Sequence, residues 1–283
     1  MKVIETISAM RADVQSARAA GKTIGLVPTM GALHAGHVSL IDAARAACDY
    51  VIVTIFVNPT QFAPTEDLGA YPRTPEADLA ACRGHGADAV FMPGVAEMYP
   101  PGALTDVRVR ALGERLCGRD RPVHFGGVCT VVAKLFNIVP ADKAFFGQKD
   151  FQQTVVIKRM AADLNFPVEV VVCPTVREAD GLAMSSRNAY LTPAQRRQAP
   201  AVYGALQVGR EMISRSHPPA REVIEAMRGR LAAQAPEGQI DYVAVVNPDT
   251  LDDVETTGGP VAIALAVRLG RARLIDNIVI SSQ

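Results

Sequence analysis

The sequence predicts an α/β protein with a mostly parallel sheet, followed by a smaller α+β domain. Three observations lead to this fold class. Over residues 1–175, short apolar runs alternate with amphipathic helical segments, which is typical of right-handed strand–helix–strand units. The run YVIVTIFV at 50–57 is β-branched at most positions, as in strands covered on both faces. After residue 176 the helices come first and the strands follow, so we expect domains at 1–175 and 176–283.

Each element of the first domain is predicted from its own pattern. Five apolar runs predict strands, at 22–29, 50–57, 87–93, 143–147 and 168–174. Helical spacing or start signals predict helices, at 37–48, from Thr74-Pro75 to Gly84 or Gly86, at 129–139 and at 151–164. At Thr74-Pro75 we expect a Thr cap followed by a proline that needs no N–H partner.

The second domain is predicted to hold two helices and three strands. Thr192-Pro193 begins a helix expected to run to about Ile213, and the helix after Pro218-Pro219 should end near Ala235. Strand-like runs cover 240–246, 261–270 and 272–280. Gly270-Arg271 lies between the last two runs and predicts a hairpin.

Composition excludes several classes of protein. The 283 residues carry 29 basic and 29 acidic side chains, without the basic excess typical of nucleic-acid binding. No apolar run approaches the ~18–20 residues of a membrane span, and the charged first 21 residues do not resemble a signal peptide. The five cysteines form no CxxC pair, which favours reduced thiols and a cytoplasmic location.

The segment PTMGALHAGH, residues 28–37, joins a predicted strand to a predicted helix. Helix starts attract phosphate through N–H groups and a partial positive charge, and ligands of open α/β sheets bind beyond the carboxyl ends of strands. His34 and His37 are three residues apart and should project to the same side. Two imidazoles there can stabilise charge on a departing pyrophosphate. The alternatives are a pair of helix-capping histidines and a zinc site, although no nearby Cys, Asp or Glu would complete one.

Polar segments follow three further predicted elements. Asn58 and Gln61 of FVNPTQF can donate and accept hydrogen bonds to hydroxyl and carboxylate groups, or they can form a solvated Asn-Pro turn. In GQKDFQQ, Lys149 is a candidate phosphate ligand, with Gln153 one turn later, or it is a solvated lysine. In MSSRN, two hydroxyls precede Arg187, whose fork fits phosphate oxygens, or the segment is a surface loop with a Ser cap.

Taken together, these motifs resemble the pantothenate synthetase (pantoate–β-alanine ligase) family of the HxGH nucleotidyltransferase superfamily. The resemblance is carried by PTMGALHAGH, FVNPTQF, YPRT (71–74), HFGGVCTVVAKLFNIV, FFGQKDFQQ and PTVREADGLAMSSRNAYL. These segments extend across most of residues 28–191, and the last ninety residues carry weaker motifs. Gln148 stands where many relatives have an acidic residue.

The resemblance implies an ATP-dependent, AMP-forming ligase with a Rossmann-like catalytic domain and a C-terminal domain that covers the active site. Pantoate and ATP would give pantoyl adenylate and pyrophosphate, and β-alanine would then displace AMP to give pantothenate. The family is usually a homodimer, and Mg²⁺ is expected with ATP. Asp78 or Asp150 could help to place the ion, but no protein ligand is assigned. Residues 62–73 are the candidate lid that would keep water from the adenylate.

The resemblance also assigns residue roles. His37, His34 and Lys149 would be catalytic. ATP would contact Met30, Gly31, Ala32, Leu33, His34, Ala35, Gly36, His37, Gly147, Gln148, Lys149, Asp150, Val176, Met184, Ser185, Ser186 and Arg187. Gln61 and Gln153 would bind pantoate, Gln61 would also touch β-alanine, and Asn58 and Arg121 are secondary candidates.

Two other classes of function stay open at this point. A nucleotidyltransferase would share the HxGH segment and stop once pyrophosphate is released. A regulatory nucleotide-binding module would not turn over at all.

Overall fold

A six-stranded parallel sheet organises the N-terminal part of the chain in the computed structural model, which describes residues 1–64, 66 and 68–281. Contacts divide the chain into two units. The first unit comprises Met1–Glu114, Gly118–Gly147 and Val156–Pro174. The second unit comprises Arg115–Cys117, Gln148–Val155 and Thr175–Gln283.

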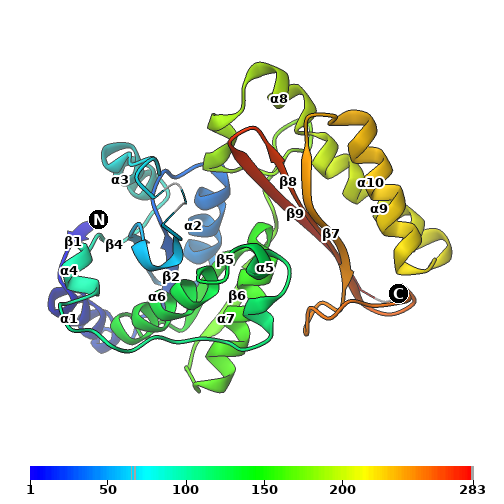
Figure 1. Ribbon diagram of the computed structural model, residues 1–283. Coiled ribbons are helices and arrows are strands. Elements are labelled where there is room, and N and C mark those ends of the chain that lie inside the picture. Colours follow the sequence, from blue (N-terminus) through cyan, green and yellow to red (C-terminus); the bar gives the residue numbers. More distant parts are fainter. Residues whose placement is uncertain (65, 67, 282–283) are drawn as a thin grey trace. The chain divides into compact units, whose positions relative to one another are not determined.

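The parallel sheet has the order β1-β4-β3-β2-β5-β6 (Figure 1). Its strands are β1 (Lys2–Ile4), β2 (Ile24–Thr29), β3 (Tyr50–Ile55), β4 (Ala89–Phe91), β5 (Lys143–Gly147) and β6 (Glu169–Cys173). The connecting helices and turns are α1 (Ile7–Ala19), α2 (Ala35–Ala47), η1 (Pro59–Gln61), α3 (Pro75–Gly84), α4 (Val95–Met98), η2 (Leu112–Glu114), α5 (Cys117–Asp120), α6 (His124–Ile138), η3 (Gln148–Asp150) and α7 (Phe151–Asp163). The predicted α/β class and all five predicted strands are confirmed. β1 and α1 are additional elements that the sequence analysis did not assign.

Helices cover both faces of this sheet. On one face, Leu40 and Ile41 of α2 share a buried cluster with Val27 of β2 and Val53 of β3. None of the residues in that cluster comes from α1 or α6. These two helices contact each other, and α1 also contacts β2, so they cover the other face. Four consecutive residues at the start of β2 are buried, as expected when the side chains on both faces of a strand are covered.

The second unit contains a three-stranded antiparallel sheet of order β7-β8-β9. Its elements are η4 (Ser186–Tyr190), α8 (Pro193–Gln198), α9 (Ala201–Ser216), α10 (Ala220–Gln234), β7 (Gln239–Val246), β8 (Val261–Leu269) and β9 (Ala272–Ile280). Leu269 pairs with Ala272 across the turn, so the predicted hairpin at Gly270-Arg271 is confirmed.

One predicted helix is two helices in the structure. The sequence predicts a continuous helix from Thr192-Pro193 to about Ile213, but α8 ends at Gln198 and α9 begins after Pro200. Proline has no N–H to donate and its ring clashes with the carbonyl four residues earlier, so it interrupts a helix. The helical pattern continues on both sides of Pro200, which is why the break was missed.

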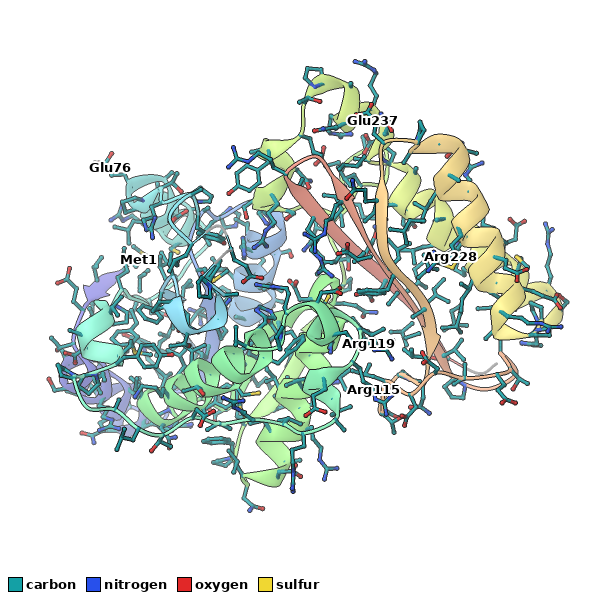
Figure 2. All side chains as sticks on the ribbon, viewed as in Figure 1. Met1, Glu76, Arg115, Arg119, Arg228 and Glu237 are labelled. Atoms are coloured by element: carbon teal, nitrogen blue, oxygen red, sulfur yellow. The ribbon has the colours of Figure 1, made fainter. Side chains whose placement is uncertain are left out.

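Two other helix starts also differ from the prediction. α6 begins at His124 and not near Cys129, so Gly126 and Gly127 lie in its first turn. Thr74 occupies the N-cap position of α3, as predicted, but it caps no backbone N–H. Its hydroxyl donates instead to Oδ1 of Asp78 at 3.1 Å. Glu76 on the same helix projects outward (Figure 2).

The cysteines are all buried free thiols, as the sequence predicted. Burial raises the pKa of Cys82 and of Cys129 to about 11. No helix in the described part of the chain has the length and apolarity needed to span a bilayer.

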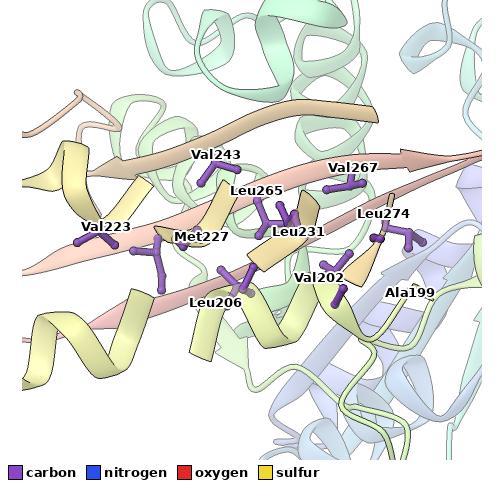
Figure 3. Close-up of a cluster of buried hydrophobic side chains, with 14 of the residues drawn as sticks. Ala199, Val202, Leu206, Val223, Met227, Leu231, Val243, Leu265, Val267 and Leu274 are labelled. Atoms are coloured by element: carbon purple, nitrogen blue, oxygen red, sulfur yellow. The ribbon is translucent and has the colours of Figure 1, made fainter. Parts of the chain in front are cut away.

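The second unit is held by one apolar core between its long helices and its sheet (Figure 3). Leu206 of α9 and Met227 of α10 are both fully buried in it. They share the cluster with Val243, Leu265 and Val267 from the sheet. Burial of such side chains supplies the main stabilising free energy of the unit.

This core gives a first prediction. Replacing Leu206, which is 0% exposed, by Ala removes buried methyl groups and leaves a cavity, so the free energy of unfolding should fall by about 2–5 kcal/mol. Urea denaturation followed by circular dichroism measures the change. Leu104→Ala is the matched control because Leu104 is 95% exposed, and its effect should stay within about 0.5 kcal/mol. Equal effects of the two substitutions would contradict the assigned core.

Candidate active site

The strand order reverses at β2, which pairs with β3 on one side and β5 on the other. In open α/β sheets, ligands bind beyond the carboxyl ends of the strands at such a switch point. Thr29 and Ile55 are register partners, so PTMGALHAGH and FVNPTQF leave the sheet at the same edge. The prediction that both segments directly follow strands of the sheet is confirmed.

His34 and His37 form the start of α2. His34 is the N-cap residue, and its Nδ1 accepts the backbone N–H of Gly36 at 3.1 Å. Nδ1 of His37 accepts the backbone N–H of His34 at a longer 3.4 Å. The two ring centroids are 4.2 Å apart, which confirms that the rings share one side of the helix start. The same two histidines cap the helix, as the capping alternative predicted.

This capping fixes how each neutral imidazole carries its proton. A ring nitrogen that accepts a backbone N–H has no hydrogen of its own, so the proton lies on the other nitrogen. Both rings therefore take the Nε2–H form. The backbone N–H groups of Gly36 and His37 are engaged inside the motif, to Nδ1 and to the carbonyl of His34. These two backbone N–H groups are therefore already used within the motif.

Asn58 and Gln61 belong to a buried hydrogen-bond network and not to a solvated turn. They are 1% and 7% exposed. Nδ2 of Asn58 donates to Oε1 of Gln61 at 3.0 Å, and Tyr99 donates its hydroxyl hydrogen to Oδ1 of Asn58 at 2.8 Å. Nε2 of Gln61 lies 3.1 Å from Sδ of Met30. The structure thus brings together Met30 from the segment after β2 and Gln61 from the segment after β3.

Gly127 allows α6 to approach η1 backbone to backbone. A Cβ atom at position 127 would lie 2.5 Å from the backbone nitrogen of Gln61, a distance that no side chain tolerates. The carbonyl of Gly127 also accepts the second N–H of Asn58 at 3.1 Å. Gly127 and Tyr99 are site-shaping residues that the sequence analysis did not assign. For Gly127, the sequence signal that could have been used is the Gly-Gly pair at the start of an apolar helix.

Arg121 lies beside this network with its charge already paired. Its guanidinium binds both oxygens of Glu66, at 2.5 and 2.9 Å, and also donates to the carbonyl of Gln61 at 3.4 Å. Burial alone would raise the pKa of Glu66, but hydrogen bonds from Arg121 and from the Ala63 N–H hold it below its usual value. Glu66 belongs to the predicted lid at 62–73, of which Thr65 and Asp67 lie outside the described residues.

In the second unit, β9 holds the segment that carries Lys149. Nδ2 of Asn277 donates to the carbonyls of Gln148 and Lys149, at 2.8 and 3.1 Å. Nζ of Lys149 lies 3.7 Å from Asp150. This segment follows directly on Gly147, the last residue of β5.

The MSSRN segment is ordered by bonds within the second unit. The N–H of Met184 donates to the carbonyl of Val176 at 3.0 Å, so these two predicted nucleotide contacts are neighbours. Oγ of Ser185 accepts the N–H of Arg187 at 3.2 Å and caps η4, as the surface-loop alternative proposed. Ser186 is the first residue of η4.

GQKDFQQ ends in two adjacent glutamines, of which the sequence analysis singled out Gln153. The structure gives the other one, Gln152, a role inside the protein. Gln152 is buried and connects the N–H of Cys117 with the carbonyl of Arg115, at 3.0 and 2.6 Å. Gln153, the predicted pantoate ligand, is half-buried. Gln152 thereby fixes the helix start on which Gln153 stands.

Comparison with known proteins agrees with this geometry. A family model described as pantoate-beta-alanine ligase matches residues 2–279. The chain belongs to this family. It is 56% identical to the pantothenate synthetase of Moorella thermoacetica, over 99% of both chains. It is 50% identical to that of Koribacter versatilis, over 100% of this chain and 97% of the relative.

Solved structures of the pantoate–β-alanine ligase family share the fold. The pantothenate synthetase of Thermus thermophilus superposes with a TM-score of 0.93 at 45% identity, over 98% of this chain and 99% of that chain. The ligase of Francisella tularensis, complexed with beta-gamma ATP and beta-alanine, gives a TM-score of 0.80 at 32% identity, over 99% and 97%. These matches support the ligase interpretation of this chain, and none of them supports the nucleotidyltransferase alternative.

Of the two carboxylates considered for Mg²⁺, Asp78 is already engaged within the protein. Asp78 is 2% exposed and accepts the N–H groups of Ala32 and Leu33, so its oxygens already have partners. Asp150 is paired with Lys149. Among the described residues, no group of three or more His, Cys, Asp or Glu side chains is placed to hold a metal ion.

The capping geometry gives a second prediction. Both histidines of the motif should show the Nε2–H form when neutral, because each Nδ1 accepts a backbone N–H. Long-range ¹H–¹⁵N spectra of ¹⁵N-labelled protein at pH 8 measure this directly. His34→Gln and His37→Gln variants assign the two signals. An Nδ1–H pattern for either ring would contradict the capping arrangement.

Proposed function

We propose that this chain catalyses the ATP-dependent condensation of pantoate with β-alanine, giving pantothenate, AMP and pyrophosphate. The observation that carries the proposal is the two-histidine start of α2, at the carboxyl edge of the sheet, in a chain of the pantoate–β-alanine ligase family. A second supporting observation is the bond between Met30 and Gln61, which joins the segments after β2 and β3.

The reaction proceeds in two displacement steps under this proposal. A pantoate carboxylate oxygen attacks the α-phosphorus of ATP, a new P–O bond forms, and pyrophosphate leaves with the electrons of the bond that breaks. The β-alanine nitrogen then attacks the acyl carbon of pantoyl adenylate, loses a proton and expels AMP. Adenylation is required because the oxygen of a free carboxylate is a poor leaving group.

The phosphates are proposed to bind the residues that follow β2 and β5. The Nε2–H groups of His34 and His37 donate to phosphate oxygens and stabilise charge that grows on the departing pyrophosphate, with His37 as the proton donor. Lys149 supplies a cationic charge beside them. The other proposed nucleotide contacts are Met30, Gly31, Ala32, Leu33, Ala35, Gly36, Gly147, Gln148, Asp150, Val176, Met184, Ser185, Ser186 and Arg187.

The acid and the amine are proposed to bind around Gln61. Gln61 and Gln153 hold pantoate, and Gln61 also touches β-alanine. Asn58 acts by holding the amide of Gln61 in one orientation, since its Nδ2 donates to Oε1 of Gln61. Arg121 is already neutralised by Glu66, so its proposed role is to fix the carbonyl of Gln61 and the segment at 62–73, the candidate lid.

Three expectations about the wider setting remain part of the proposal. Mg²⁺ enters with ATP and is held by phosphates and water, the usual mode for this ion. The enzyme is a homodimer and works in the cytoplasm.

Product analysis tests the reaction. Purified protein with ATP, pantoate and β-alanine should form pantothenate and AMP in equal amounts, detected by mass spectrometry. Omission of β-alanine should leave only the small amount of adenylate that the enzyme itself binds. A stable nucleotidylated product that accumulates whether or not β-alanine is present would instead indicate a nucleotidyltransferase. Failure to release pyrophosphate from ATP and pantoate would indicate a regulatory module.

Substitution of the phosphate donors tests their roles. His37→Ala and Lys149→Ala should each lower kcat on the order of 10²–10³-fold, because each removes a donor for developing charge. His85→Ala and Lys158→Ala are matched controls on exposed side chains and should keep kcat within about twofold of wild type, as surface changes usually do. Near wild-type turnover of either phosphate-donor variant would remove that residue from the mechanism.

A further inference from the structure

The loop between β2 and α2 has an unusual backbone. Gly31 and Ala32 both have positive φ angles, 80° and 50°. Ala32 in this left-handed region is uncommon for a residue with a Cβ. Such a conformation persists only when surrounding contacts hold it. Because His34 follows two residues later, these contacts decide where the phosphate-binding histidines lie.

The contacts that hold the loop come from Asp78 on α3. Oδ2 of Asp78 accepts the N–H of Ala32 at 3.0 Å, and Oδ1 accepts the N–H of Leu33 at 2.8 Å. Thr74 donates its hydroxyl to Oδ1 at 3.1 Å. Successive N–H groups at a left-handed residue form a small anion-binding concavity, and here a carboxylate of the protein itself fills it.

The fit between carboxylate and loop leaves no spare room. Asp78 is 2% exposed, and a Cβ atom at position 31 would lie 2.9 Å from its Oδ2. Thr29 accepts the N–H of Gly31 through its own hydroxyl oxygen at 3.2 Å. The loop is therefore fixed from both ends, by β2 and by the first turn of α3.

We propose that Asp78 is a positioning residue, whose carboxylate holds the loop at 31–33 so that His34 and His37 present their Nε2–H groups to the phosphates. Asp78 itself touches no substrate. The inference rests on the proposed function for its kinetic consequence, while its structural part concerns only the two histidines.

Asp78→Asn is the most direct test. The side chain keeps its size, but one acceptor becomes an N–H₂ group that opposes a backbone N–H, so the loop must shift. Small displacements of catalytic groups cost up to about 100-fold in rate, and we expect kcat for pantothenate formation to fall about 10- to 100-fold. The KM for β-alanine should stay within about twofold of wild type, because the amine site at Gln61 lies on another loop.

Two controls separate positioning from stability. Asp142→Asn alters a similar bond at the opposite end of β2, where Oδ2 of Asp142 accepts the N–H of Ile24 at 2.6 Å. Urea denaturation measures the free energy of unfolding that each variant loses. At a comparable loss of this free energy, Asp142→Asn should keep kcat within about threefold of wild type. Glu76→Gln changes an exposed acid on α3 and should leave kcat unchanged.

A spectroscopic readout tests the same inference without turnover. The imidazole ¹⁵N and Cε1–H signals of His34 and His37 should shift in Asp78→Asn and stay in place in Asp142→Asn. Thr74→Val covers the case in which Asp78→Asn does not fold. It removes one donor to the carboxylate and should lower kcat about two- to fivefold with smaller shifts of the same signals.

The outcomes are distinguishable. Unchanged histidine signals with kcat within twofold of wild type, in Asp78→Asn or in its substitute Thr74→Val, would overturn the inference. An equal loss of kcat in Asp142→Asn at equal stability would also overturn it. A wild-type protein that forms no pantothenate would instead overturn the proposed function, and the histidine signals would still decide the role of Asp78.

Discussion

The parallel pairing of β2 with β3 and β5 is the constraint on which the rest of the candidate site depends. Parallel strands end at the same edge of a sheet, so segments far apart in the chain leave it as neighbours. The register partners Thr29 and Ile55 place the loops that carry His34 and Gln61 side by side. A slip of one residue in this register would turn each following side chain to the opposite face.

Local hydrogen bonds then fix the orientation of the side chains that these loops carry. The histidines accept backbone N–H groups through Nδ1, Asn58 orients the amide of Gln61, and Asp78 holds the loop before α2. These groups are buried or half-buried, where an unpaired polar atom is costly. The site therefore owes its geometry to polar groups that must be satisfied.

The sequence predicted helices and strands well where a single pattern, such as an apolar run or a turn pair, marked the segment. The apolar runs at β2 to β6 and the hairpin of β8 and β9 emerged from periodicity and turn residues alone. The break at Pro200 was missed because helical spacing continues on both sides of it. The contacts of Asp78 with the loop were missed because Ala32 and Leu33 lie more than forty residues away, and no local pattern shows which carboxylate will fill a concavity of N–H groups. The pairing of Arg121 with Glu66 escaped prediction for the same reason.

Under the proposed role of Gln61 in binding the acid, the approach of α6 to η1 at Gly127 bears on how the enzyme could be altered to accept other acids. On that side Gln61 rests against main chain, and there is no side chain to shorten. The side-chain nitrogen of Gln61 also contacts the thioether of Met30, a flexible group that adapts its shape readily. Under this proposal, engineering of acid selectivity should begin at position 30, where the neighbour of Gln61 is a flexible side chain.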